Sequence, residues 1–521
     1  MTIISRRNFA KTVTAGLGGT MIPPFSSVNI SGKGAAAIKK KPNIVFICSD
    51  QHSHRFNGFA GHPLVKTPNL DRIAANGVVF SDTYSGNPVC VPGRSSMMTG
   101  MYASDCNSYC NSTVWDGSHP TWGTMLREEG YYCRAIGKMD LNDDFDTGFE
   151  EIETSHGHRY RPDITSLFRR PVGYRVEERK NVDGSRREER HVDARRTESG
   201  LQFLRERETG KKSPFALYIG LTQPHPKFSA LDKYYDMYPE YSVDMPNIPP
   251  GHLEELHLVF QELQHFKRVA STIAEERVRR ARAAYYAMIT ELDEYVGMVW
   301  DELERQGEID NTLFIYTSDH GESLGDHGLW YKNHLYDAAA RVPLIMAGAG
   351  LPRNMKIDIP AGHVDMVATI LELAGSDAYK KIRGKSLLPV IAGDSCEIPS
   401  FAYSESHSEG NCTGSFMVRK GDWKYIHFSW YDDLLFNVRK DPGEFNNLID
   451  DPATSSVQAE LKDILWSLVD PEEVTAKAFN AQKRILDGFV AEMAEEELFE
   501  MFRGRLGNGQ ARIMARHLKE G

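Results

Sequence analysis

The chain has 521 residues, of which 41% are hydrophobic and 26% are charged, and its formal net charge is -11. This length provides two or three packed units, and this balance is typical of a soluble globular protein, which excludes the fibrous and disordered classes. The negative charge argues against non-specific binding to nucleic acid or to an anionic membrane surface, although a few basic groups in a cleft could still bind an anion.

Residues 1–41 are predicted to form an export signal with a linker. The run Ser5-Arg6-Arg7-Asn8-Phe9-Ala10-Lys11 precedes a mildly apolar, glycine-rich stretch, as in twin-arginine signals. Glycines and Pro23-Pro24 interrupt that stretch, so we expect no stable membrane span. The expected partner is the twin-arginine translocase, and the expected location is periplasmic or secreted.

Continuous apolar runs predict buried strands over 43–48, 215–221 and 312–317, with a further strand over 342–346. Amphipathic segments lie between these runs, and the longest extends from Ile273 to Gln306 with helical spacing. Polar residues follow the ends of the runs. Strands that alternate with helices in this way predict an α/β sheet with its site at the carboxyl edge.

The Arg-rich region 151–200 is predicted to be a solvated helix or loop. Beyond Gly393, short strands are expected at 416–418, 423–426 and 434–437, and helices from Ser455 onwards. Residues 394–521 are therefore predicted to form a smaller α+β domain with antiparallel strands and a helical tail. The main domain is expected over 42–393.

Seven cysteines, an odd number, are spread along the chain and do not form the pattern of a disulfide scaffold. Cys106 and Cys110 have a spacing that zinc ligands use, but no second Cys/His pair follows nearby. Packed thiols or one local disulfide are the favoured interpretations of this pair.

The most informative segment is Asn87-Pro88-Val89-Cys90-Val91-Pro92-Gly93-Arg94. Alone, its C-x-P-x-R pattern is also compatible with a buried cysteine that opens a helix. Its context consists of Thr67-Pro68-Asn69-Leu70-Asp71-Arg72 upstream, Ser96-Met97-Met98-Thr99-Gly100 downstream, and Ser318-Asp319-His320-Gly321-Glu322 and Arg341-Val342-Pro343-Leu344-Ile345 much later. In this order, the motifs resemble the type I sulfatases of the alkaline phosphatase superfamily from about Pro42 to Pro452.

This resemblance implies a mixed, largely parallel sheet sandwiched by helices, with 42–393 as the catalytic domain. It also implies that a formylglycine-generating or sulfatase-maturating enzyme oxidises Cys90 to formylglycine, with Pro92 and Arg94 in its recognition core. A hydrated aldehyde offers two hydroxyls on one carbon, so one can attack sulfur and the other can expel the sulfate afterwards. A thiol would instead leave an adduct that clears slowly.

The resemblance places a divalent metal on Asp50, Gln51, Asp319 and His320, with the nucleophile derived from Cys90 as a further ligand. Most relatives carry Asp at the position of Gln51 and Asn at the position of His320. A site with mostly oxygen ligands favours Ca²⁺, and His320 leaves Mg²⁺ or Mn²⁺ open.

Further roles follow from the same family pattern. Lys332 is expected to bind a sulfate oxygen, His225 to donate a proton to the leaving oxygen, and Lys138 to pair with the formylglycine hydrate alongside Arg94. Without the family pattern, a lone lysine is more often a solvated charge and a lone histidine a structural one.

Asp140 departs from the family pattern, because many relatives place His there. The form Gly137-Lys138-Met139-Asp140 is similar to that of arylsulfatase K and points towards uronate 2-O-sulfate in a glycan, while the choline-sulfatase group shares most motifs. The alternatives are a phosphonate monoester or phosphodiester hydrolase and a catalytically silent binder of sulfated glycans. Substrate contacts are guessed, besides Asp140, at His54, Arg55, Asn87 and His407.

Overall fold

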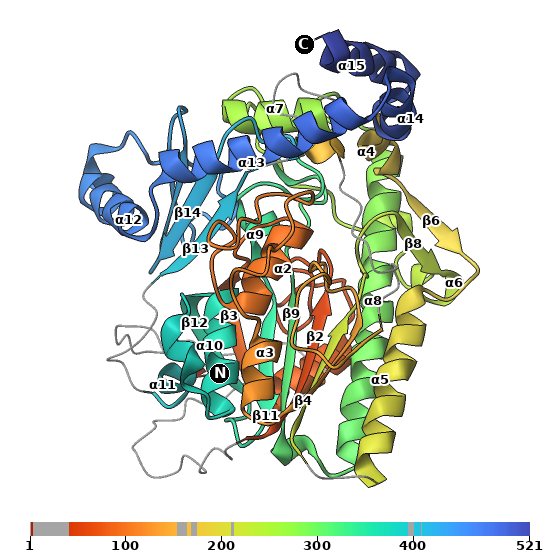
Figure 1. The fold of residues 1–521 in the computed structure, drawn as a ribbon, viewed down its shortest axis with the longest axis vertical. Helices are drawn as coiled ribbons and strands as arrows, with labels where there is room; N and C mark the ends of the chain where they lie inside the picture. Colours follow the sequence, from red (N-terminus) through yellow and green to blue (C-terminus); the bar gives the residue numbers. More distant parts are fainter. Residues whose placement is uncertain are drawn as a thin grey trace, which may run out of the picture.

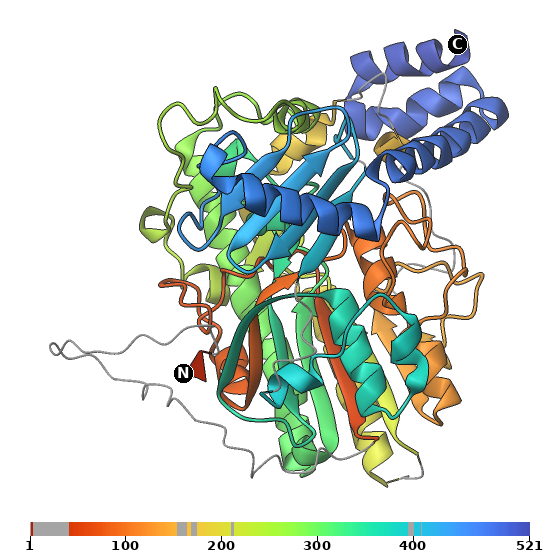
Figure 2. The ribbon, with the colours of Figure 1, turned by 90° about the vertical axis from the view of Figure 1, so that its left-hand side faces the viewer.

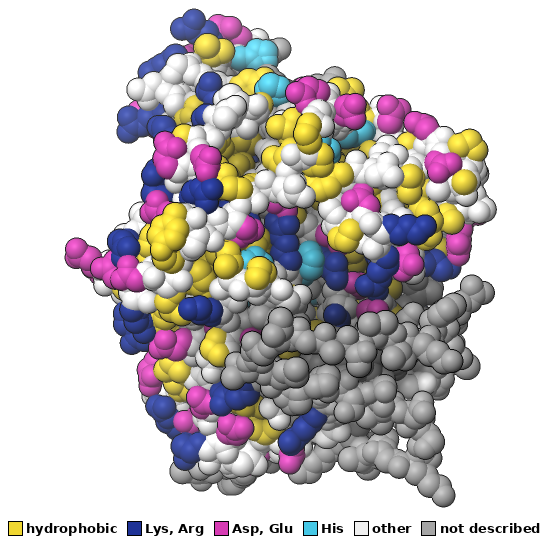
Figure 3. All heavy atoms as spheres, turned by 180° about the vertical axis from the view of Figure 1, so that it is seen from behind, with side chains coloured by type: hydrophobic (Ala, Val, Ile, Leu, Met, Phe, Trp, Pro, Cys, Tyr) yellow, Lys and Arg dark blue, Asp and Glu magenta, His cyan; other side chains and the backbone are white. Residues whose placement is uncertain are grey.

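A computed structural model describes residues 2–3, 41–153, 164–167, 174–209, 213–393, 401–407 and 409–520. The paired arginines of the predicted export signal lie outside these residues, as does Cys396. Within the described part of the chain, every helix is too short or too polar to cross a membrane. Figure 3 shows acidic, basic and hydrophobic side chains interspersed over one face of the molecule.

A ten-stranded sheet forms the centre of the molecule, in the order β1-β12-β3-β11-β9-β2-β7-β4-β5, with β10 paired to β3 (Figure 1). Most neighbours are parallel, and β11 is antiparallel to both β3 and β9. The strands are β1 (Thr2–Ile3), β2 (Asn43–Ser49), β3 (Gly77–Tyr84), β4 (Tyr132–Gly137), β5 (Glu151–Glu153), β7 (Phe215–Gly220), β9 (Thr312–Ser318), β10 (Arg341–Val342), β11 (Leu344–Gly348) and β12 (Met355–Gly362). The expected α/β class with a mixed, largely parallel sheet is confirmed.

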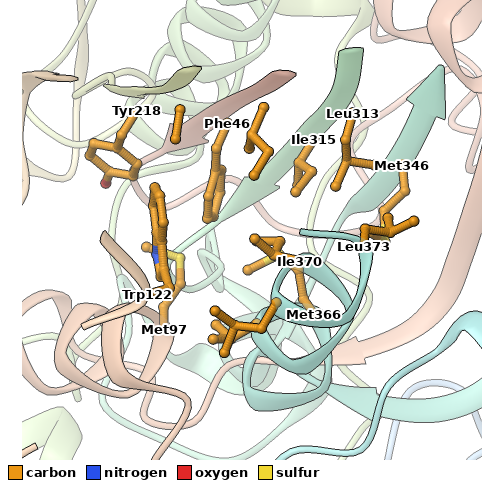
Figure 4. Packing of buried hydrophobic residues seen from close by; sticks show 14 of the residues in the cluster. Phe46, Met97, Trp122, Tyr218, Leu313, Ile315, Met346, Met366, Ile370 and Leu373 are labelled. Carbon is orange, nitrogen blue, oxygen red and sulfur yellow. The ribbon is translucent and has the colours of Figure 1, made fainter. Parts of the chain in front are cut away.

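Alternate residues of the central strands point to opposite faces of the sheet, because the side-chain period of a strand is two. Phe46 of β2 and Ile315 of β9 pack into the layer shown in Figure 4, which also contains Trp122 and Ile370. Their neighbours along the strands pack into a second layer against helices α1 (Pro68–Ala75), α5 (Val192–Thr209) and α8 (Glu275–Arg305). Both faces are therefore buried, which explains why these strands read as continuous apolar runs.

Helices cover both faces of the sheet (Figures 1 and 2). The helices up to residue 391 are α1 (Pro68–Ala75), α2 (Cys90–Thr99), α3 (Trp122–Glu128), α4 (Val176–Asn181), α5 (Val192–Thr209), α6 (Asp232–Tyr235), α7 (Leu258–Phe266), α8 (Glu275–Arg305), α9 (Asp337–Ala340), α10 (His363–Leu373) and α11 (Leu388–Ile391). The long amphipathic segment predicted between Ile273 and Gln306 is thus one helix, α8.

A second, antiparallel sheet has the order β13-β14-β15-β16. Its strands are β13 (Ala402–Ser406), β14 (Ser415–Lys420), β15 (Trp423–Phe428) and β16 (Leu434–Asn437), followed by helices α12 (Ser455–Leu468), α13 (Pro471–Glu492), α14 (Glu495–Leu506) and α15 (Asn508–Glu520). Helix α12 packs on this sheet, and α14 and α15 form a hairpin at the end of the chain (Figure 2). The expected short strands and helical tail are present.

Two local expectations need correction. The region 151–200 is not simply solvated, because Val182, Asp193 and Arg196 are buried, and β6 (Gly184–Arg187) pairs with β8 (Phe228–Leu231). The strand expected over 342–346 is divided at Pro343, which lacks an N–H for the sheet. Cys106 and Cys110 are buried and form no disulfide, so of the two favoured interpretations the packed thiols are confirmed.

Candidate active site

Four neighbouring parallel strands, β9, β2, β7 and β4, end at the same edge of the sheet. Each is followed within five residues by a residue of the expected site; these residues are Asp319 and His320 after β9, Asp50 and Gln51 after β2, His225 after β7, and Lys138 and Asp140 after β4. The carboxyl edge of a parallel sheet is the usual place for a site in such folds. Residues that are far apart in sequence are thereby brought to one edge.

Cys90 is the first residue of α2, and its side chain is almost fully buried. The preceding residue, Val89, provides no side-chain cap, and the Oδ1 atom of Asn111 instead accepts a hydrogen bond from the Val91 N–H at 3.1 Å. Gly93 is required for close packing, because a Cβ atom there would lie 2.5 Å from the carbonyl oxygen of Asn87. The sulfur is therefore held at a helix N-terminus with little freedom.

Three groups surround the Cys90 sulfur. Lys332 Nζ lies 2.9 Å from Sγ, His320 Nε2 lies 3.3 Å from it, and Asp50 Oδ1 lies 3.8 Å from it. Burial and the Asp50 carboxylate both raise the pKa of the thiol, but the cations of Lys138 and Lys332, with His320, outweigh them and lower the pKa to about 5. The sulfur thus occupies a pocket that favours an anionic oxygen or sulfur nucleophile.

Arg94, one turn further along α2, is completely buried. Its Nε donates to Asp319 Oδ2 at 2.8 Å, and its Nη1 donates to the Tyr218 hydroxyl at 2.8 Å and to the backbone carbonyl of Lys138. These bonds tie the nucleophile helix to the ends of β9, β7 and β4. Arg94 therefore orients the site, while its Nη2 has no hydrogen-bond partner within the described residues.

Lys138 connects two carboxylates. Its ammonium forms an ion pair with Asp50 and lies 3.2 Å from Asp140 Oδ2, and Arg94 Nε lies 3.7 Å from the same Asp140 oxygen. Burial opposes the charged form, yet Asp140 and Asp50 raise the pKa of Lys138 well above its usual range. Asp140 is partly exposed and has a positive φ of 55°, a conformation that Asp tolerates better than most residues. It lies in the site, where its carboxylate faces cations.

The donor set is suited to a divalent cation. One ligand atom from each of Asp50, Cys90, Asp319 and His320 lies within 4.8 Å of the others, and all four side chains are buried. His320 Nδ1 lies 3.1 Å from the carbonyl oxygen of Gly321, which can only accept, so Nε2 carries the lone pair that faces the cluster. Two buried carboxylates this close together repel each other unless a cation lies between them.

Gln51 is also suited to bind a divalent cation. Its Nε2 donates to Glu322, and its Oε1 is buried without a hydrogen-bond partner among the described residues. Such an orphaned oxygen is costly and is suited to a cation ligand. The backbone of Gln51 has a φ of 70°, and it is held by the Tyr285 hydroxyl, which donates to the Gln51 carbonyl at 2.7 Å. These partners of Gln51 were not identified from the sequence.

His225 lies in the turn after β7 and is partly exposed. Its Nδ1 lies 2.7 Å from the carbonyl oxygen of Pro226, so Nδ1 carries a proton and Nε2 is available for exchange. Burial raises the pKa of Asp50, whereas Lys138 and His225 are among the groups that hold it well below its usual range, which places His225 within electrostatic reach of Asp50. Sequence reasoning missed Asp193 of α5, whose carboxylate accepts hydrogen bonds from the Thr222 and Gln223 N–H groups at 2.8 to 3.0 Å.

The four guessed substrate contacts have other surroundings. His54 is mostly buried, and Arg55 forms an ion pair with Asp326 while stacking on a phenylalanine ring. Asn87 is fully buried, and both polar atoms of its side chain lack a partner within the described residues. His407 is fully buried beside Glu405, with its Nε2 atom 3.0 Å from a carboxylate oxygen. No measured contact connects these four to Cys90 among the described residues.

Comparisons with known proteins identify the family of this chain. Residues 42–376 match the Sulfatase family model, and residues 325–470 match the model for the C-terminal part of N-sulphoglucosamine sulphohydrolase. Arylsulfatase K of Danio rerio is 29% identical over 467 residues, which cover 85% of this chain and 87% of that protein. Choline-sulfatase of Rhizobium meliloti (strain 1021) is 30% identical over 473 residues, which cover 85% of this chain and 90% of that protein.

A solved structure extends the agreement to the fold. The phosphonate monoester hydrolase of Agrobacterium radiobacter has a TM-score of 0.68 and 24% identity, covering 82% of this chain and 95% of that one. An α/β sheet with a buried cysteine, carboxylates and lysines at its carboxyl edge is an arrangement suited to a hydrolase of anionic esters. The match over more than half of the chain makes the assignment specific: the chain belongs to the sulfatase family and is a sulfuric ester hydrolase.

Proposed function

We propose that this sulfatase removes sulfate from a sulfated saccharide, with a uronate 2-O-sulfate as the first candidate, through a formylglycine made from Cys90 and one divalent cation. The observation that carries the proposal is the convergence of Lys332, His320 and Asp50 on the Cys90 sulfur within 3.8 Å. An alcohol-releasing hydrolase needs a nucleophile, a group that neutralises the anion and a proton donor, and residues suited to these three roles lie at this edge.

The formylglycine would supply a hydrated aldehyde, whose paired hydroxyls divide the hydrolysis into two easier steps. Cys90 is followed by Pro92 and Arg94, the residues that a maturating enzyme is expected to recognise. Because Arg94 has bonds to Asp319, Tyr218 and Lys138, it would fix the position of the modified side chain as it now fixes Cys90.

Asp50, Gln51, Asp319 and His320 would hold the divalent cation together with the side chain made from Cys90. The cation would supply Lewis-acid chemistry, lowering the pKa of a bound hydroxyl and neutralising the ester. The oxygen-rich donor set favours Ca²⁺, and His320 also allows Mg²⁺ or Mn²⁺.

The fixed charges of the site are matched to an anionic substrate. The three carboxylates of Asp50, Asp140 and Asp319 balance the charge of the three cations Arg94, Lys138 and Lys332. Lys138 pairs with Asp50 and Asp140, and Arg94 pairs with Asp319. Lys332 contacts the Cys90 sulfur. A divalent cation would leave the pocket positive. Lys332, which is 7% exposed, is the group placed to bind a sulfate oxygen beside the nucleophile.

The choice of a saccharide rests on relatives and on one local motif. The 29% identical relative is Arylsulfatase K, and this chain has the form Gly137-Lys138-Met139-Asp140 that resembles that group. In the structure, Asp140 faces Lys138 and Arg94 and remains 19% exposed, so it can still contact a substrate hydroxyl. Because the 30% identical relative is Choline-sulfatase, a small sulfate ester is the substrate to compare.

The test combines mass spectrometry with turnover. We expect the peptide that contains Cys90 to show conversion to formylglycine in enzyme made with its maturating enzyme, and we expect release of inorganic sulfate from a saccharide that carries uronate 2-O-sulfate. Cys90→Ala should abolish release while leaving the thermal unfolding temperature nearly unchanged, because it removes one small side chain. Turnover by a fully unconverted thiol would refute the formylglycine step.

A phosphonate ester assay separates the alternative function. The fold is shared with a phosphonate monoester hydrolase, and the Gln51 ligand does not distinguish the two reactions. We expect kcat/KM to be higher for the sulfate ester than for a matched phosphonate monoester. The reverse order would make phosphonate hydrolysis the principal activity.

We also propose export to the periplasm or outside the cell through the twin-arginine translocase. The support is the motif around Arg6 and Arg7 with its interrupted apolar stretch. Replacing both arginines by lysine should retain the protein in the cytoplasm, as measured by cell fractionation. Unchanged export of that variant would contradict this route.

A further inference from the structure

The backbone that carries Lys332 adopts an unusual conformation. Tyr331 has a φ of 67° and Asn333 a φ of 81°, and neither residue is glycine. Asn tolerates this left-handed region, but a bulky residue such as Tyr331 keeps it only where the surrounding structure imposes it. The position of the Lys332 ammonium, 2.9 Å from the Cys90 sulfur, therefore depends on groups that hold this turn.

One of these groups is a buried ammonium from a different element. Lys267 lies at the carboxyl end of α7 and is only 2% exposed. Its Nζ donates to the carbonyl oxygen of Trp330 at 2.9 Å and to the carbonyl oxygen of Lys332. One cation thus holds the carbonyls on both sides of Tyr331, which draws the turn together.

Other hydrogen bonds also hold this turn, but they involve groups different from the two carbonyls that Lys267 contacts. Glu322 Oε1 accepts the Tyr331 N–H at 2.7 Å, and Asn333 N–H donates to the carbonyl oxygen of Pro88 at 3.2 Å. Both fix N–H groups of the turn. The carbonyls of Trp330 and Lys332, the latter belonging to the sulfate-binding lysine itself, are those that Lys267 satisfies.

The charge of Lys267 is unusual in its placement. Within the described part of the chain, no carboxylate lies at ion-pair distance from it, although Glu178, Glu322 and Glu409 lie close enough to act electrostatically. A buried charge without a paired carboxylate is costly and must be compensated by hydrogen bonds. Here the compensation comes from the backbone of the Lys332 turn, so the interaction constrains both partners.

We propose that Lys267 is a positioning residue for the sulfatase reaction: its ammonium fixes the turn of Trp330 to Lys332, so that Lys332 reaches the sulfate group beside the nucleophile. The proposal rests on the sulfate-binding role proposed for Lys332. Lys267 itself does not touch the substrate, so it acts through the geometry of Lys332.

The first test uses Lys267→Met, which keeps the length of the side chain and removes the charge and the donors. We expect kcat/KM to fall by about 10- to 100-fold, the range associated with small misplacements of a catalytic group, and inhibition by inorganic sulfate to weaken in parallel. Lys267→Arg, which retains charge and donors, should recover part of both. Activities are normalised to folded enzyme and to the converted fraction of Cys90 measured by mass spectrometry.

A matched control is Lys424→Met. Lys424 is also fully buried, but it pairs with Asp337 and Glu444 at 2.8 and 2.7 Å in an ion network of its own. We expect this variant to have a lower unfolding temperature and unchanged kcat/KM per folded enzyme. It therefore measures the effect of losing a buried lysine as such.

Non-additivity distinguishes positioning from a purely structural role. If Lys267 acts through Lys332, then Lys332→Met should weaken inorganic sulfate binding, measured by calorimetry, and Lys267→Met should add little to that loss. Additive losses, or wild-type kcat/KM and sulfate binding in Lys267→Met, would overturn the proposal. Failure of both Lys267 variants to fold while Lys424→Met folds would also overturn it. Unchanged turnover in Lys332→Met would instead refute the sulfate-binding role, which is a separate result.

Discussion

The side chains around Cys90 would be costly to bury one at a time. Asp50, Asp319 and Arg94 are all inaccessible to solvent, and an isolated buried charge is normally neutralised or excluded. Here each charge has an opposite partner, as in the 2.8 Å contact between Arg94 and Asp319. These fixed charges surround Cys90, and preorganised charges of this kind stabilise the charge that develops in a transition state.

His225 provides a test of proton donation at this scale. With Nδ1 bonded to the Pro226 carbonyl, its Nε2 can protonate a leaving oxygen. Removing it should matter most where the leaving alcohol is basic, so His225→Ala should lower kcat about 10²-fold or more for an alkyl or sugar sulfate and much less for a nitrophenyl sulfate. The measurement is the ratio of kcat values for the two substrates. Equal losses would argue against the acid role.

The sequence predicts the residues that carry motifs, and it misses those defined only by folding. Cys90, Arg94 and Asp319 were identified because the family pattern includes them. Tyr218 and Lys267 were not identified, because their partners in the site are distant in sequence. Tyr218 bonds to Arg94, which is 124 residues away, and Lys267 bonds to Lys332, which is 65 residues away. Neither residue type has a local signal: a tyrosine in an apolar strand reads as core, and a lysine after a helix reads as solvated.

Among the elements, the central strands were predictable and the flanking ones less so. The runs that became β2, β7 and β9 are buried on both faces and read as continuous apolar segments. Strand β4 was missed because Arg134 interrupts its apolar pattern, although it delivers Lys138 to the site. The role of α5 was also missed, since its many charged residues indicate a solvated helix, whereas Asp193 and Arg196 are buried.

Asp193 of α5 is predicted to hold the turn that carries His225. Its carboxylate accepts hydrogen bonds from two successive N–H groups of that turn and from Arg196 at 2.7 Å. Asp193→Asn removes the charge and one acceptor, so we expect kcat/KM for a sugar sulfate to fall about tenfold or more through misplacement of the acid. The control is Glu198→Gln on the same helix, which loses only an exposed contact with Arg205. Equal activities in the two variants would contradict this role.

A second element-scale prediction concerns pH. Asp293 of α8 accepts hydrogen bonds from the first turn of α1, from the Asn69 N–H at 3.1 Å and the Leu70 N–H at 2.7 Å. Burial nevertheless outweighs these bonds and raises the pKa of Asp293 to about 6. An unfolded Asp has a pKa of about 3.9, so between these values the folded chain holds a proton that the unfolded chain releases.

Stability should therefore fall as pH rises from about 4 to 6, by at most about 3 kcal/mol from this group, and the loss is complete above that window. Asp293→Asn removes the titration. The difference in unfolding temperature between variant and wild type should shift in favour of the variant as pH rises from 4 to 6, in thermal scans at fixed ionic strength. Parallel curves for the two proteins would show that the pKa is not raised.

At the scale of the whole molecule, ion pairs around one buried carboxylate join the two sheets. Asp82 of β3 lies 3.0 Å from Arg439, which follows β16, and 3.6 Å from Arg419 of β14. Arg341 of β10 also contacts Asp82 at 2.5 Å. Strands of the large sheet and of the smaller sheet therefore share one carboxylate, and the short strand β10 leads back from the Lys332 turn. The C-terminal sheet is thus bound to the catalytic sheet by charge as well as by apolar packing.

This sharing predicts a clear effect from one neutral substitution. Asp82→Asn would remove the counter-charge that Arg341, Arg419 and Arg439 share. Arg341 keeps its contact with Asp337, and the 40% exposed Arg439 keeps its contact with Asp358, so the cost should stay below the ~3 to 5 kcal/mol of breaking a fully buried pair. We expect a clear decrease in the unfolding temperature with kcat/KM per folded enzyme unchanged, because Asp82 does not contact Cys90. Asp422→Asn is the matched control, since Asp422 is exposed and lies 3.5 Å from the same Arg439, where a surface pair contributes less than about 1 kcal/mol. If both variants unfold at the wild-type temperature, the shared carboxylate does not hold the sheets together.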